Sequence, residues 1–275
     1  MASEGQVIQK SNLPATADSL QADFTALGVE LGMTLLVHSS LSAMGWVNGG
    51  PVAVIIALQH VLGSTGTLVM PAHSTGLTDP SGWENPPVPQ SWRHIIRETM
   101  PAYRPDLTPT RSMGVISETF RKQNGVLRSV HPHVSFCAFG AHAEKITENH
   151  SLAFGMGEDS PLARIYDLGG HVLLLGVGYE RNSSLHLAEY RATYPAKRIV
   201  QEGAPICTSG VSTWTTFDNI DLDDSDFEHI GDAFVNSEAG NVVRRGRVGL
   251  ADCQLMPQRE IVDFAVDWIE VYRAK

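Results

Sequence analysis

An apolar strand, a polar turn and a helix that opens with a histidine follow one another between residues 171 and 192. Residues 172–177 are apolar without interruption, which is typical of a strand covered on both faces. The turn after them is polar, and residues 185–192 have good helix propensity. Together with the mixed order of strands and helices elsewhere, this unit predicts an α/β fold around a buried sheet.

His186 and Glu189 follow the carboxyl end of that strand, the place where α/β folds position their chemistry. A histidine in the first turn of a helix sits at the positive end of the helix dipole, which favours the neutral imidazole that a general base requires. Glu189 is three residues further on, so both side chains share one helix face. The carboxylate either orients the imidazole or holds a cationic substrate.

Length and composition predict one soluble domain. The 275 residues, 43% hydrophobic, suffice for a single α/β domain over residues 14–275, with residues 1–13 as a flexible N-terminus. We expect neither a membrane span nor a secretory signal, because no run of about 18 apolar residues and no basic segment before an apolar core is present. Three cysteines without paired spacing are typical of reduced thiols, which favours a cytoplasmic location.

The charge is acidic, at −10 from 30 acidic and 20 basic residues. Nucleic acid is therefore not expected as a partner, because neutralising phosphates requires a basic face. An acidic field would concentrate a polycationic ligand, although solubility alone is the plainer explanation.

Periodicity and capping signals place the remaining elements. Helices are predicted over residues 16–29, 51–62, 112–122, 160–169, 227–236 and 259–273, and strands over residues 34–37, 66–70 and 134–139. Residues 198–217 and 242–255 alternate like antiparallel strands. Residues 73–110 have little periodicity and predict a long irregular segment, which in a compact domain is usually functional or disordered.

Two loops have the composition of an anion site. Ser39 and Ser40 offer hydroxyl and N–H groups after the strand at residues 34–37, although a serine-rich turn without a ligand fits them as well. Ser112 or Gly114 would open a helix with free N–H groups for the same anion, and an ordinary capped helix is the alternative.

Histidine spacing gives little support for a metal centre. His131 and His133 flank a proline, but neither His-Glu-x-x-His nor Cys-x-x-Cys is present, so His131 is expected to order a loop. Residues 221–228 carry five carboxylates, for which a solvated helix entry is the simple explanation and a pocket for ammonium groups the functional one. The motifs of α/β-hydrolases, P-loop proteins and dinucleotide-binding folds are also missing.

Seven segments occur in a distinctive order. They are residues 35–41 (Leu-Leu-Val-His-Ser-Ser-Leu), 66–71 (Gly-Thr-Leu-Val-Met-Pro), 111–120 (Arg-Ser-Met-Gly-Val-Ile-Ser-Glu-Thr-Phe), 131–133 (His-Pro-His), 172–178 (Val-Leu-Leu-Leu-Gly-Val-Gly), 182–189 (Asn-Ser-Ser-Leu-His-Leu-Ala-Glu) and 246–249 (Gly-Arg-Val-Gly). In this combination the chain resembles the aminoglycoside 3-N-acetyltransferase family over roughly residues 15–272. The segment Leu-His-Leu-Ala-Glu is the most specific of these signals.

The resemblance implies transfer of an acetyl group from acetyl-coenzyme A to the 3-amino group of a 2-deoxystreptamine ring, which would confer antibiotic resistance. It also implies a layered α/β/α fold with a mixed central sheet, a smaller antiparallel portion in the C-terminal third, and no metal. Carried over by position, His186 is the catalytic base and Glu189 its acidic partner. Ser183 and Ser184 stand where relatives often have threonines, which keeps the hydroxyl chemistry.

The resemblance also assigns two sets of binding residues. The coenzyme would be held by His38, Ser39, Ser40, Leu41, Ser112, Met113, Gly114 and Val115. The aminoglycoside would contact Asp79, Glu189 and Glu228.

Other functions remain compatible with the same residues. The fold could acetylate a different amine, with residues 73–110 choosing the acceptor. A non-catalytic aminoglycoside or coenzyme A binding protein is disfavoured by the intact His186 and Glu189, and a metal-dependent amide hydrolase by the histidine spacing. The sequence does not distinguish a monomer from a homodimer.

Overall fold

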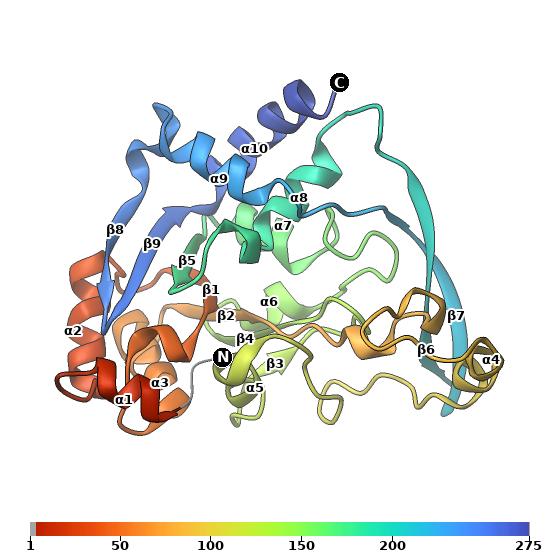
Figure 1. Ribbon diagram of the computed structural model, residues 1–275, viewed down its shortest axis with the longest axis horizontal. Coiled ribbons are helices and arrows are strands. Elements are labelled where there is room, and N and C mark those ends of the chain that lie inside the picture. Colours follow the sequence, from red (N-terminus) through yellow and green to blue (C-terminus); the bar gives the residue numbers. More distant parts are fainter. Residues whose placement is uncertain (1–3, 275) are drawn as a thin grey trace.

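Seven strands form one mixed sheet at the centre of the structure, a computed structural model that describes residues 4–274 (Figure 1). Their order across the sheet is β3 (Leu127–Arg128), β4 (Phe136–Gly140), β2 (Thr67–Pro71), β1 (Thr34–Ser39), β5 (His171–Leu175), β9 (Ala251–Pro257) and β8 (Arg244–Val248). Strand β1 pairs in parallel with both β2 and β5, whereas the other pairs are antiparallel. The mixed central sheet expected from the family resemblance is confirmed.

Successive side chains of the central strands point alternately into two separate hydrophobic cores, one on each face of the sheet. Leu35 and Val37 of β1 belong to one core, and Leu36 between them belongs to the other. This is the alternation of a strand whose two faces are both buried. The strand therefore reads as a continuous apolar run.

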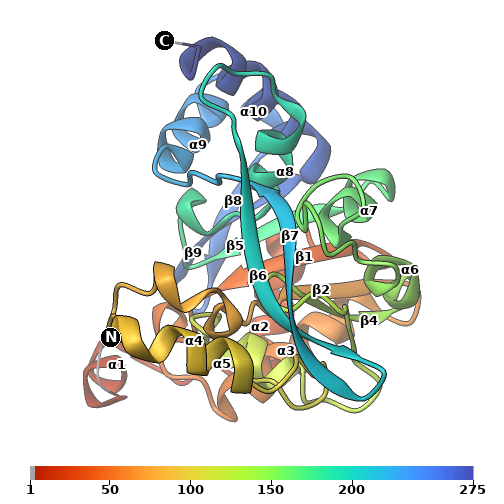
Figure 2. The same cartoon turned by 90° about the vertical axis from the view of Figure 1, so that its right-hand side faces the viewer.

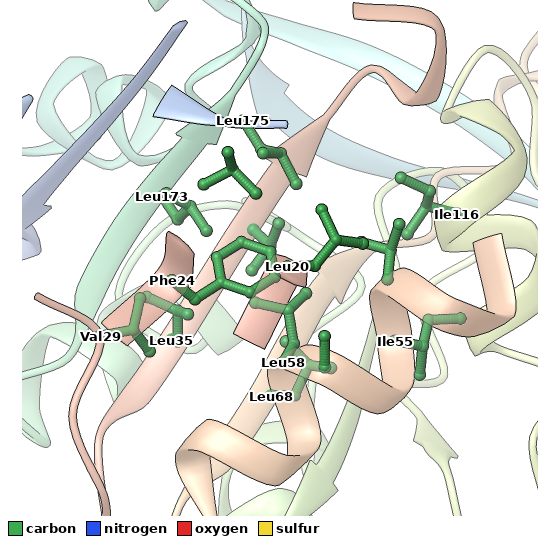
Figure 3. Close-up of a cluster of buried hydrophobic side chains, with 14 of the residues drawn as sticks. Leu20, Phe24, Val29, Leu35, Ile55, Leu58, Leu68, Ile116, Leu173 and Leu175 are labelled. Carbon is green, nitrogen blue, oxygen red and sulfur yellow. The ribbon is translucent and has the colours of Figure 1, made fainter. Parts of the chain in front are cut away.

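The first core lies between the sheet and three helices, α2 (Ala17–Leu27), α3 (Gly50–Leu62) and α5 (Gly114–Phe120). Figure 3 shows Leu20 and Phe24 of α2 beside Leu58 of α3, packed against Leu35 and Leu173 of the sheet. Residue Thr16 starts α2 with a capping box, and Gly28 ends it in the left-handed conformation at φ 102°. The predicted helices at residues 16–29 and 51–62 are thus confirmed within one or two residues.

The second core covers the opposite face. It is formed by α6 (Ala143–Thr147), α7 (Pro161–Asp167), α8 (Ser184–Arg191), α9 (Phe227–Val235) and α10 (Gln258–Tyr272). In Figure 1, α8, α9 and α10 lie above the strands while α2, α3 and α5 lie below them. The layered α/β/α arrangement is therefore confirmed.

Strands β6 (Ile199–Thr208) and β7 (Val211–Ile220) form a separate antiparallel hairpin. Figure 2 shows this long hairpin running down one side of the molecule, with α4 (Gln90–Thr99) beside it. The hairpin is the antiparallel portion predicted for the C-terminal third. It is tied to the segment after α4, since Ser212 Oγ donates to the carbonyl oxygen of Met100 at 2.9 Å.

Helix α4 corrects the expectation that residues 73–110 are irregular. Ten residues of this segment are helical, and short 3₁₀ turns precede them at Thr75–Leu77 and Pro80–Gly82. None of the side chains of α4 is fully buried, and Trp92 and Ile95 are exposed. The apolar residues Trp92, Ile95 and Ile96 do recur at helical spacing, so the local signal was present. The helix is short and lies between proline-containing stretches, which favoured an irregular structure for the whole segment.

Residues Glu4–Lys10 form helix α1, within the segment expected to be flexible. The helix buries Val7, and Glu4 Oε1 accepts a hydrogen bond from Trp46 Nε1 at 3.1 Å. These tertiary contacts hold a polar stretch that has little helical pattern of its own. The extent of the domain, residues 14–275, stays a prediction.

The remaining short 3₁₀ segments are Leu41–Met44, Tyr179–Arg181 and Ala239–Val242. Across residues 4–274 we find no helix that is both long and apolar enough to cross a membrane.

Candidate active site

The carboxyl ends of β2, β1 and β5 meet at one edge of the sheet, because these three neighbouring strands are parallel. A cavity of about 1210 Å³ opens at this edge. Its wall includes the loop after β1, the start of α5, the loop after β5 and His186 of α8. This is where ligands bind in α/β sheets.

The start of α8 positions His186. Asn182 is buried, and its Oδ1 accepts the backbone N–H of Ser184 at 3.1 Å. His186 is the third residue of the helix, as predicted, and its ring packs at 4.8 Å from the ring of Phe227. The position of His186 in the first turn of α8 and its contact with Phe227 together hold the imidazole at the wall of the cavity.

His186 and Glu189 form a hydrogen-bonded pair, with Nδ1 of the histidine 2.6 Å from Oε2 of the glutamate. A carboxylate only accepts when ionised, so Nδ1 carries the hydrogen and Nε2 keeps its lone pair. No hydrogen bond occupies Nε2 within residues 4–274. The imidazole is thereby arranged to accept a proton.

Glu189 is fully buried, and both of its oxygens are engaged. Oε2 faces His186, while Oε1 accepts from the backbone N–H of Asp223 at 2.9 Å and from Nη1 of Arg273 at 2.7 Å. Of the two roles that the sequence left open, this geometry fits the orienting one. Contact of Glu189 with a substrate ammonium, also assigned by the resemblance, would require the carboxylate to give up these partners.

Two charged neighbours of this pair, Arg273 and Asp226, were not predicted from the sequence. Arg273 binds Glu189 and Asp226 together, with Nη2 at 2.5 Å from Oδ1 of Asp226. Asp226 belongs to the acidic run at residues 221–228, which marked the region but not the residue. Arg273 reaches Glu189 across 84 positions of sequence, so no local signal points to it.

His38 and His73 bring two more imidazoles to the cavity wall. His38 is the last residue but one of β1 and lies on the same face as Leu36, the face covered by α8. The ring of His73 packs on Phe136 of the same core. Burial lowers the pKa of each to about 3, and repulsion from His186 adds to the effect. Both therefore stay uncharged at neutral pH and do not repel a cationic ligand.

The two segments assigned to the coenzyme lie side by side. His38, Ser39, Ser40 and Leu41 line the same cavity as Ser112, Met113, Gly114 and Val115. A Cβ on Gly114 would lie only 3.7 Å from the carbonyl oxygen of Ser39. Left-handed backbone at Ser112 (φ 62°) and Gly114 (φ 79°) makes the turn that brings them together.

Asp79 and Glu228 do not belong to the wall of this cavity as residues 4–274 define it. Asp79 caps the 3₁₀ turn Pro80–Gly82, and its Oδ1 lies 2.7 Å from Nη2 of Arg97. The hydrogen bonds from Arg97 lower the pKa of Asp79 to about 2. Glu228 lies beside Glu180, which raises the pKa of Glu228 to about 6. It lines an adjoining pocket of about 820 Å³ that shares residues 176–178 with the main cavity.

His131 orders its loop, as predicted, because its Nδ1 accepts the backbone N–H groups of His133 and Val134 at 3.1 Å each. His133 instead pairs with Glu202 of the hairpin at 2.8 Å. Over residues 4–274 we find no group of three or more His, Cys, Asp or Glu side chains arranged to hold a metal ion.

A layered α/β fold with a cavity and a histidine–carboxylate pair at the carboxyl edge of its sheet has the arrangement of an enzyme active site. Residues 36–270 match the family model described as aminoglycoside 3-N-acetyltransferase. The chain belongs to the aminoglycoside 3-N-acetyltransferase family, and it is accordingly an acyltransferase.

Three relatives illustrate the similarity. The chain is 47% identical to the SPbeta prophage-derived aminoglycoside N(3')-acetyltransferase-like protein YokD of Bacillus subtilis, over 96% of this chain and 95% of the relative. The crystal structure of YokD superposes with a TM-score of 0.95 at 44% identity, covering 98% and 99% of the two chains.

Aminoglycoside N(3)-acetyltransferase VII of Streptomyces paromomycinus is 38% identical, over 96% of this chain and 94% of the relative. The structure of AAC-IIIb in a binary complex with CoASH matches with a TM-score of 0.82 at 34% identity, covering 94% and 97% of the chains.

Proposed function

We propose that this enzyme transfers the acetyl group of acetyl-coenzyme A to the 3-amino group of the 2-deoxystreptamine ring of aminoglycosides, with His186 as the general base. The observation that carries the proposal is the pair of His186 and Glu189, whose geometry leaves Nε2 free to accept a proton at the cavity wall. Family membership supports the acetyl donor and the acceptor, because relatives are named for this reaction and one binds CoASH.

Proton transfer is needed because an aminoglycoside amine is an ammonium at neutral pH and has no lone pair for attack. Nε2 of His186 accepts one proton, and the amine nitrogen then attacks the thioester carbonyl carbon. The resulting tetrahedral intermediate expels the coenzyme A thiolate, which takes the proton back from His186, while the amide nitrogen releases its remaining excess proton to water. Glu189 stabilises the imidazolium that exists between these steps. General base action of this kind contributes about 10²–10⁴ in rate.

Positioning has to supply most of the remaining acceleration. For the coenzyme we propose the adjacent segments at residues 38–41 and 112–115, which line one side of the cavity. A hydroxyl such as that of Ser112, or a backbone N–H, would donate to the oxyanion of the intermediate.

The acceptor side is proposed to be acidic. Glu180 and Asp224 line the cavity itself, and Glu228 lies in contact with Glu180. These carboxylates would hold the other ammonium groups of the drug and so select the amine that is presented. Asp79 remains a proposed outer contact, since Arg97 already neutralises it.

The reaction explains a resistance function. Acetylation removes one positive charge from the drug and adds bulk, which weakens its attraction to RNA phosphates. The three free cysteines Cys137, Cys207 and Cys253 are compatible with the reducing cytoplasm that we propose as its location.

Thiol release from acetyl-coenzyme A by the purified protein tests the proposal. We expect release with kanamycin and gentamicin and none with an aminoglycoside that lacks the 3-amino group, and NMR of the product should place the acetyl group on N3. Release without any acceptor would instead indicate hydrolysis. Release only with unrelated amines would support the alternative that the fold acetylates another acceptor, and binding of both ligands without release would indicate a non-catalytic protein.

A further inference from the structure

Arg273 joins the buried carboxylate of Glu189 to a second carboxylate, Asp226. Nη1 of Arg273 lies 2.7 Å from Oε1 of Glu189, while Nε and Nη2 lie 2.8 and 2.5 Å from the two oxygens of Asp226. Nη2 also donates to the carbonyl oxygen of Asp223 at 2.7 Å. The guanidinium is thus held on several sides immediately after the end of α10.

A fully buried glutamate needs such a partner. Burial alone favours the protonated, neutral form of a carboxyl group. Although burial opposes the charge on the arginine too, the carboxylates of Asp226 and Glu189 raise the pKa of Arg273 further above its usual range. Arg273 therefore stays cationic beside Oε1 of Glu189, while Oε2 of Glu189 faces Nδ1 of His186.

We propose that Arg273, anchored by Asp226, is a positioning residue that holds Glu189 aimed at His186, and that the charges of Arg273 and Asp226 together set the proton affinity of the His186–Glu189 pair. The inference rests on the proposed function, because it assigns His186 the role of base. Arg273 does not touch the reacting groups and acts only through Glu189.

Charge signs make the proposal specific. The cation of Arg273 opposes a second proton on His186, whereas the anion of Asp226 favours it. Removing Arg273 should therefore raise the pH at which His186 titrates, and removing the charge of Asp226 should lower it. A general loosening of the site would move both variants in the same direction.

Other titratable groups surround the pair and are left in place by these substitutions. They are His38 in β1, His73 after β2, Asp223 and Asp224 before α9, and Tyr190, Tyr194 and Lys197 along and after α8. These groups are the same in both variants. They therefore cannot shift the His186 midpoint in opposite directions in Arg273→Met and Asp226→Asn.

NMR titration of ¹⁵N-labelled histidines tests the inference without any substrate. The His186 signal is assigned by its loss in His186→Gln. We expect Arg273→Met to raise the His186 midpoint by about one pH unit, a tenfold change in protonation, and Asp226→Asn to lower it. Arg259→Met is the matched control, since Arg259 also lies on α10 but donates to the carbonyl oxygens of Tyr166 and Asp167. Midpoints that stay within about 0.3 unit of wild type in both variants, or move the same way, would overturn it.

Activity gives a second readout. In Arg273→Met the acid limb of the kcat/KM profile should move up with the NMR midpoint, so that about tenfold of activity is lost at pH values well below the midpoint and regained about two pH units above it. Arg273→Lys keeps the charge and should lose less, and Asp226→Asn serves if Arg273→Met does not fold. A loss that alkaline pH does not restore would show a merely structural role. A wild-type protein that acetylates no aminoglycoside would refute the proposed function, while the NMR midpoints would still decide the role of Arg273.

Discussion

Nδ1 of His186 lies 2.6 Å from Oε2 of Glu189, a carboxylate that is fully buried. The two residues are three positions apart on α8, so helix geometry alone brings them together. Burial of the carboxylate comes from elsewhere, since Asp223 and Arg273 enclose its other oxygen. The pair is therefore local in origin but depends on distant residues for the burial of its carboxylate and for its ion pair.

His186→Ala should abolish most turnover while leaving the fold intact. The variant loses its general base, so kcat should fall by about 10² or more, and calorimetry should still detect binding of acetyl-coenzyme A. His229→Ala, which removes an exposed histidine of α9, is the control and should keep normal activity. A His186→Ala enzyme that retained more than about a tenth of wild-type kcat would remove His186 from the base role.

Glu189→Gln should reduce kcat less than His186→Ala, because the imidazole remains. It should also destabilise the protein by about 3 kcal/mol, since the substitution leaves Arg273 without one of its buried anionic partners. Urea unfolding measures the change. Glu158→Gln is the matched control, because Glu158 pairs with Arg191 at an exposed site and should cost less than about 1 kcal/mol. Equal losses of stability in both variants would contradict the buried pairing.

Asp79→Asn tests the outer acceptor contact that the family resemblance assigns. If Asp79 attracts an ammonium group, its loss should raise KM for the aminoglycoside about fivefold without changing kcat. Arg97→Met should do the opposite and lower KM, because it frees the carboxylate from its ion pair. Steady-state kinetics measures the KM for the aminoglycoside, and Asp106→Asn is the control because Asp106 also pairs with an arginine but is exposed. An unchanged KM in both Asp79→Asn and Arg97→Met would exclude Asp79 from the acceptor site.

Glu228 should make the stability of the protein fall as pH rises through 6. Its hydrogen bond and repulsion with Glu180, together with burial, raise the pKa of Glu228 to about 6, above the value of 4.5 for an ordinary glutamate. A raised carboxyl pKa stabilises the fold below the unfolded value, and this contribution is lost as pH rises through the folded one.

Glu228→Gln removes the repulsion, so it should raise Tm at pH 8 and have little effect or lower Tm at pH 5, as thermal unfolding would show. Glu144→Gln alters an exposed glutamate in the first turn of α6 and controls for the loss of charge at a helix start. The same Tm change at both pH values would mean that Glu180 and Glu228 do not share a proton.

Patterns that act over a few residues were readable from the sequence. The apolar run of β5, the helix start at His186 and the spacing to Glu189 follow from strand and helix periodicity, which each segment expresses by itself. The hairpin of β6 and β7 was likewise visible in its alternation. Helix α4 was missed although Trp92, Ile95 and Ile96 share one helix face, because it is a short helix within a segment rich in proline.

Tertiary structure alone decided which charges meet. Arg273 reaches Glu189 from the end of α10, and Arg97 neutralises Asp79, although nothing near either arginine in sequence indicates a partner. Ion pairs of this kind have no period, since they depend on how whole elements pack. The sequence by itself determined the layered α/β fold and the histidine–glutamate pair, whereas the packing of α8, α9 and α10 determined that this glutamate is buried and held by an arginine.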